Sequence, residues 1–112
     1  MKILAHSLAV AIVLGFISSY VFASGDLQKG KALFNDPKAF GGVRACSACH
    51  PDGSGLEHAA GKKQFHVAGQ TQESIEEAVN ACIVNASQGK AIDVKSGKMS
   101  DIVAYIISLK KE

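Results

Sequence analysis

The run Cys46-Ser47-Ala48-Cys49-His50 constrains this chain more than any other feature. The C-x-x-C-H pattern is the attachment signature of c-type haem. Two thiols three positions apart can each bond to one of the two vinyl groups of a single porphyrin, and the histidine that follows is then held at the iron as its proximal ligand. We therefore expect one covalently bound haem c, with Cys46 and Cys49 as thioether anchors and His50 as an axial iron ligand.

Two other kinds of site also use paired cysteines. A thioredoxin-like redox pair would stand at the head of a helix in a βαβ unit, and no strand-like run precedes Cys46. A zinc site would need a second pair of ligands at finger-like spacing, and His58 and His66 are eight positions apart, wider than the usual gap. The haem interpretation therefore explains the motif best.

The first residues have the features of an export signal. Lys2 provides a short positive region, an apolar stretch follows, and Val21-Phe22-Ala23 places small residues where a signal peptidase reads. We expect residues 1–23 to be a cleaved signal peptide and residues 24–112 to be the folded domain, in the periplasm. The alternative is an uncleaved leader that anchors the domain to the inner membrane, because 21 residues are about long enough to span it.

Charge and size limit the class of protein further. Loss of Lys2 with the leader leaves 11 basic and 10 acidic residues, a balance that favours neither nucleic acid nor an anionic membrane as partner. The remaining 89 residues make a single small domain. Domains of this size bury little surface and often depend on an additional crosslink or cofactor. A haem bonded to the chain would serve that purpose.

Three segments carry helix signals, and no alternating strand of useful length appears. The first covers residues 25–34, with Asp26 as the N-cap. The second begins with the capping box Ser74–Glu77 and runs through about residue 86. The third covers about residues 98–109, with apolar side chains at helical spacing. These signals predict an all-α domain.

The helix segments place the chain beside a known family. Gly30-Lys31-Ala32-Leu33-Phe34 before the C-x-x-C-H motif, together with Val103-Ala104-Tyr105-Ile106 after it, resembles the terminal helix pair of class I c-type cytochromes. The resemblance covers nearly all of residues 25–110. It implies a cytochrome c fold for residues 24–112, with three to five helices wrapped around one haem, and a contact between Gly30 and Tyr105 where the two helices cross.

The second axial ligand of the iron has several candidates. In most class I cytochromes it is a methionine in a loop before the last helix, whereas Met99 is expected inside the first turn of that helix. Cys82 is the third cysteine, and its helical spacing turns it inward together with Val79 and Ile83. The remaining possibilities are Lys90, His58, His66 or an open position.

A second, more local resemblance bears on Cys82. The region from Ile75 to Leu109 is similar to a haem domain shared by thiosulfate dehydrogenases and the haem subunit of the sulfur-oxidising complex. In that domain the matching cysteine is a distal haem ligand. The resemblance therefore implies Cys82 as the distal ligand, with Met99 as the alternative.

These features together predict a periplasmic monohaem c-type cytochrome that carries single electrons between redox partners. We expect a monomer that meets those partners weakly and transiently, and an electron carrier rather than an enzyme. The alternatives are a haem domain that acts in thiosulfate-type oxidoreduction and a sensor that binds a small gas at a vacant distal position.

Overall fold

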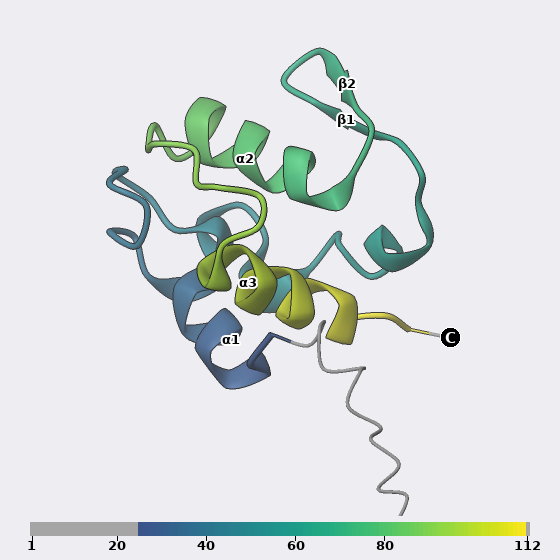
Figure 1. The fold of residues 1–112 in the computed structure, drawn as a ribbon, viewed down its shortest axis with the longest axis horizontal. Coiled ribbons are helices and arrows are strands. Elements are labelled where there is room, and N and C mark those ends of the chain that lie inside the picture. Colours follow the sequence, from purple (N-terminus) through teal and green to yellow (C-terminus); the bar gives the residue numbers. More distant parts are fainter. Residues whose placement is uncertain (1–24, 112) are drawn as a thin grey trace, which may run out of the picture.

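The computed structural model describes residues 25–111. Its regular elements are α1 (Leu27–Asn35), β1 (Phe65–Val67), β2 (Gln70–Gln72), α2 (Ile75–Asn85) and α3 (Gly97–Ser108) (Figure 1). The expected signal peptide, residues 1–23, lies outside the described part of the chain. Within that part, no helix combines the length and the apolar character needed to cross a membrane.

Each α-helix begins with a side-chain cap that the sequence supplies locally. Asp26 accepts a hydrogen bond from the N–H of Lys29 at 3.0 Å, and Ser74 accepts one from Glu77 at 3.1 Å. Ser96 caps α3 in the same way. These caps satisfy N–H groups that have no partner inside the helix. The three predicted helices are therefore confirmed, with ends that differ by one or two residues.

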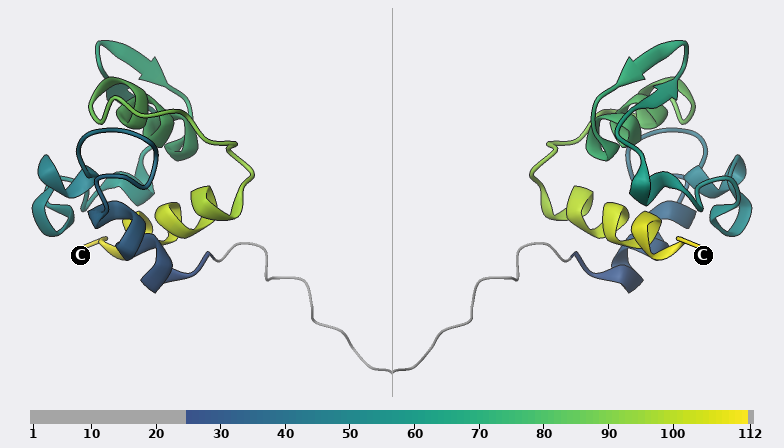
Figure 2. Two further views of the ribbon diagram at one scale, coloured as in Figure 1. Left: turned by 90° about the vertical axis from the view of Figure 1, so that its left-hand side faces the viewer. Right: turned by 90° about the vertical axis from the view of Figure 1, so that its right-hand side faces the viewer.

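Helices α1 and α3 cross in close contact, as Figure 2 shows from two sides. A Cβ atom built at Gly30 would collide with the carbonyl of Asp101 and lie 3.0 Å from the Cβ of Tyr105. The rings of Phe34 and Tyr105 pack with their centroids 5.1 Å apart and their planes tilted by 58°. The contact between Gly30 and Tyr105 that the resemblance implied is thus present.

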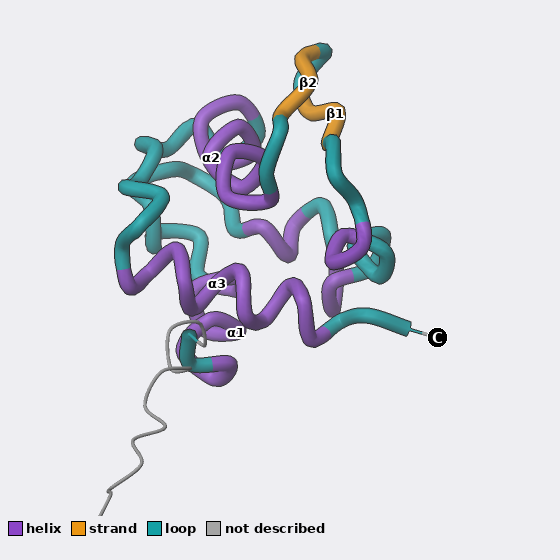
Figure 3. Tube along the Cα trace, turned by 45° about the vertical axis from the view of Figure 1, so that its right-hand side comes forward, coloured by secondary structure: helices purple, strands orange, loops and turns teal. Residues whose placement is uncertain are grey.

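Helix α2 lies on the other side of the molecule from α1, across the hydrophobic core (Figure 3). Its inward side chains, Val79 and Ile83, are buried. The largest side chains that are fully buried are Phe34, Ile83, Met99 and Ile102. All three helices therefore contribute to one core, and α2 is positioned by that core rather than by close contact with a single helix.

The segment between α1 and α2 contains strands that the sequence did not predict. Strands β1 and β2 form a short antiparallel hairpin in which Phe65 pairs with Gln72. Ala68 and Gly69 both have positive φ, of 53° and 78°, as a two-residue hairpin turn of the primed type requires. Strands of three residues are too short to produce a detectable alternation in the sequence. The fold is helix-rich, with this hairpin added.

Candidate cofactor site

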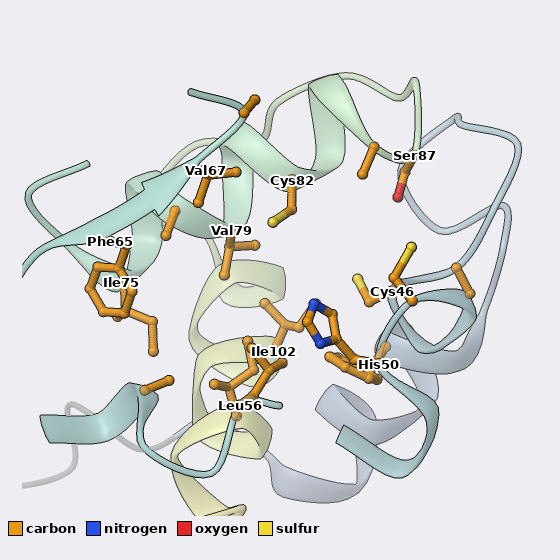
Figure 4. A pocket seen from close by; sticks show the side chains of 18 of the residues that line it. Cys46, His50, Leu56, Phe65, Val67, Ile75, Val79, Cys82, Ser87 and Ile102 are labelled. Carbon is orange, nitrogen blue, oxygen red and sulfur yellow. The ribbon is translucent and has the colours of Figure 1, made fainter. Parts of the chain in front are cut away.

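An apolar cavity of about 360 Å³ lies between α2 and the segment that carries the C-x-x-C-H motif. Figure 4 shows the side chains that line it, which also come from β1 and α3. The larger apolar ones are Phe34, Leu56, Phe65, Val67, Ile75, Val79, Ile102 and Ile106. Cofactor and ligand sites are mostly apolar and have volumes of roughly 300–1,000 Å³. The cavity has the size and character of such a site.

A tight turn brings the two cysteines and the histidine of the motif to this cavity. Residues Cys46–Ala48 form a 3-10 turn. The N–H groups of Cys49 and His50 donate to the carbonyl of Cys46 at 3.2 and 3.0 Å. Cys46, Cys49 and His50 all line the cavity, and Cys49 is also exposed to solvent. The spacing of the motif therefore delivers two thiols and one imidazole to a single pocket.

The ring of His50 is held in one orientation by its own loop. Its Nδ1 lies 2.8 Å from the carbonyl oxygen of Ser54. A carbonyl only accepts hydrogen bonds, so Nδ1 carries a proton, and in the neutral ring Nε2 keeps the lone pair that a metal can bind. A Cβ at Gly55 would lie 3.4 Å from Nδ1, and the φ of Gly55 is +92°. Glycine at this position lets the loop turn tightly beside the ring.

Cys82 faces the same cavity from α2, across from the C-x-x-C-H segment. It lies on the inward side of α2, three residues after Val79, and both side chains line the cavity. The Cys82 sulfur and the His50 ring both point into the space between α2 and the motif (Figure 4). The chain therefore offers one nitrogen donor and one sulfur donor on two sides of one cavity.

In the chain without a bound group, burial favours the protonated form of the Cys46 and Cys82 thiols. It raises the pKa of Cys46 to about 11, with a further contribution from the nearby Cys82. Burial also raises the pKa of the Cys82 thiol, and the neighbouring Cys49 adds to the shift. In a low-dielectric pocket the charged thiolate is disfavoured unless a cation stands beside it. Cys82 would thus become a strong anionic donor only when it binds a metal.

Three of the four other candidate iron ligands lie outside the cavity. Met99 is 1% exposed in the hydrophobic core and does not line the cavity. Neither Lys90 nor His58 lines it, whereas His66 does. No group of three or more His, Cys, Asp or Glu side chains within residues 25–111 is arranged to hold a metal ion. A haem iron, by contrast, takes only one or two axial ligands from the protein.

The structure adds polar residues to the site that the sequence did not single out. Ser87 is 5% exposed, and its hydroxyl points into the cavity near Cys46. Ser87 is held in place because the N–H of Val43 donates to its carbonyl at 2.8 Å, which ties the segment before the motif to the end of α2.

The Ser54 carbonyl was also not identified from the sequence as a partner of His50. Its only sequence signal is the proline and the two glycines that follow His50, which indicate a turn but not a partner for the ring.

Comparison of the chain with models of protein families and with curated proteins finds no match.

Proposed function

We propose that this protein is an exported monohaem c-type cytochrome that carries single electrons. The observation that carries the proposal is the juxtaposition of the C-x-x-C-H side chains with Cys82 across one apolar cavity of about 360 Å³. The motif is specific for covalent haem attachment, and the cavity has the apolar lining that a porphyrin needs. Residues 1–23 carry the export signal that would bring the chain to the periplasm.

Each residue of the site has a definite task in this proposal. Cys46 and Cys49 would hold the haem c through thioether bonds, and His50 would bind the iron through Nε2. The hydrogen bond from His50 Nδ1 to Ser54 at 2.8 Å fixes the ring and makes its free nitrogen a better donor. The haem supplies a one-electron Fe(III)/Fe(II) couple.

Cys82 is the proposed distal ligand, in preference to Met99. The Cys82 side chain lines the cavity, whereas Met99 is enclosed in the core and contributes nothing to the cavity wall. A thiolate is an anionic donor, so it stabilises the ferric state more than a thioether does. The resulting carrier would have a low reduction potential.

The mostly apolar lining of the cavity favours an electron carrier over an enzyme. Most of the lining is apolar, and apart from the groups assigned to haem attachment and iron ligation its polar side chains are Arg44, Lys62, His66 and Ser87. Little polar surface is left to bind and orient a second molecule. The chain's part is then to exclude water and to keep one ligand geometry in both oxidation states.

The test uses the full chain, produced in a bacterial host with haem-attachment machinery and recovered from the periplasm. Mass spectrometry should show a chain that lacks residues 1–23 and carries the added mass of one haem. A processed chain without added mass would rule out the proposal.

The distal ligand is tested by Cys82→Ala, with Met99→Leu as the matched control. Because a thiolate favours the ferric state, Cys82→Ala should raise the reduction potential and change the electron paramagnetic resonance spectrum of the oxidised protein. Met99→Leu conserves volume in the core and should leave both unchanged. The opposite pattern would assign the ligand to Met99.

A further inference from the structure

The basic side chains Arg44 and Lys62 and the imidazole of His66 line the cavity, whereas no Asp or Glu is among its lining residues in the described part of the chain. An apolar interior with basic groups at its edge is complementary to a ligand that has an apolar body and anionic substituents. A porphyrin with two carboxylate side chains is such a ligand.

The tether at Cys46 and Cys49 determines where those carboxylates would lie. The thioethers form on one edge of the porphyrin, and the two propionate groups occupy the opposite edge. Figure 4 places Cys46 at one end of the cavity and Phe65 at the other, with His50 and Cys82 between them. A haem bonded at Cys46 would therefore direct its carboxylates toward the end near Phe65.

Lys62 comes three residues before Phe65 in the sequence and His66 directly follows it, so we assign both to that end of the cavity, which both residues line. Lys62 closes a 3-10 turn, with its N–H donating to the carbonyl of the buried Ala59 at 3.2 Å. His66 is in β1, directly opposite Thr71 in the hairpin. The fold thus anchors the backbone of both residues while their side chains remain at the cavity edge.

Thr71 also holds the imidazole of His66. Its hydroxyl lies 3.2 Å from His66 Nδ1. When the hydroxyl donates to Nδ1, the proton of a neutral ring is on Nε2, which becomes a hydrogen-bond donor. An ammonium group and an imidazole N–H together are suitable partners for a carboxylate, because charge-assisted hydrogen bonds are the stronger ones.

We infer that Lys62 and His66 form a carboxylate-binding seat that holds a propionate group of the haem at the end of the cavity opposite the two thiols. This inference rests on the proposed function. The hairpin that the sequence did not predict then has a role, since it presents His66 and supports it through Thr71.

The experiment compares Lys62→Ala, His66→Ala and Thr71→Val with Lys63→Ala in the exported holoprotein. Lys63 carries the same charge as its neighbour but does not line the cavity. All four positions are exposed, so the variants should fold. The readouts are the carboxylate bands in the redox-difference infrared spectrum and the fraction of reduced protein at a fixed solution potential.

We expect Lys62→Ala and His66→Ala to shift a carboxylate band, and Thr71→Val to do so more weakly. Loss of the Lys62 cation should also lower the ratio of reduced to oxidised protein about threefold, because a nearby positive charge favours the added electron. Lys63→Ala should leave the carboxylate bands unchanged and should change the ratio of reduced to oxidised protein less than Lys62→Ala does.

Two results would overturn the inference. Bands that are the same in Lys62→Ala, His66→Ala and the parent protein would show that neither side chain binds a carboxylate. Equal effects of Lys62→Ala and Lys63→Ala would mean that only surface charge is involved. Either result leaves the proposed function intact if the haem mass is present, whereas a parent chain without haem removes the proposed function and the seat together.

Discussion

The two halves of this molecule are packed in different ways. Where α1 meets α3, backbone lies against backbone at Gly30, two aromatic rings pack at a tilt, and the N–H of Asp26 donates to the Asp101 carboxylate at 2.7 Å. Where α2 faces the C-x-x-C-H segment, the chain leaves an apolar cavity of about 360 Å³. Protein interiors are normally close-packed. The contrast indicates that the half formed by α1 and α3 is close-packed by the chain alone, whereas the half that contains α2 leaves space for a bound group.

The largest effect is expected in the close-packed half. In Gly30→Ala the new methyl group would overlap the backbone carbonyl of Asp101, which cannot move aside as a flexible side chain can. Overpacking of this kind should lower the free energy of unfolding by about 3 kcal/mol, measured by urea denaturation of the holoprotein.

Gly97→Ala is the control for that variant. Gly97 begins α3, and a methyl group added there would meet no atom within 4 Å, so alanine should leave stability equal or slightly higher. If Gly30→Ala were as stable as Gly97→Ala, the helix crossing would be looser than the structure describes, and the contrast between the two halves would fail.

A smaller effect is expected at the cavity half, where a single side chain fastens the loop after α2. The Asn80 amide donates to the carbonyl of Ile92 and accepts from its N–H, both at 2.8 Å. Asn80→Ala removes both bonds and should cost about 1–3 kcal/mol. Asn85→Ala, which removes only an exposed bond to Ala81 within α2, should change stability by less than about 0.5 kcal/mol.

Amide hydrogen exchange would show which residues lose protection in Asn80→Ala. Faster exchange confined to residues 86–96 would mean that Asn80 holds this loop alone. A uniform increase over α1 and α3 would mean instead that the two halves unfold as one unit, and the distinction between them would then apply to packing but not to stability.

The smallest effect concerns the loop beside His50 and depends on pH. Backbone N–H groups of Glu57 itself and of Gly55 lower the pKa of the Glu57 carboxyl below its usual 4.5, and the Gly55 bond is 2.9 Å long. A carboxyl whose pKa is lower in the folded state stabilises the fold above the unfolded pKa, and this contribution is lost as the pH falls through the folded value.

Glu57→Gln should therefore be slightly less stable than the parent near neutral pH, and the difference should shrink as the pH falls below about 4.5 and through the lower pKa of folded Glu57. Thermal unfolding from pH 7 to pH 3 measures it. A difference that is constant over this range would mean that the charge of Glu57 does not contribute to the loop beside His50.

Several features of the fold could be predicted from local sequence. Asp26 and Ser74 were predicted as caps and do cap the helices that follow them, because a cap depends on residues three positions apart. Ser96, which caps α3, was not predicted. The approach of Gly30 to Tyr105 was implied by a family resemblance and is present. The hairpin was missed, because its three-residue strands carry no periodic signal and a positive φ at Ala68 is unusual for a residue other than glycine.

Sequence alone determined that Cys46, Cys49 and His50 lie together, because five consecutive residues in one tight turn cannot separate. It left Cys82 and Met99 as competing partners for them, since both lie far along the chain and both have helical spacing that turns them inward. Only the tertiary structure distinguished the two, by directing Cys82 into the cavity and Met99 into the core. The packing of the three helices decides whether an inward side chain meets the cavity or the core. No local sequence pattern encodes that packing.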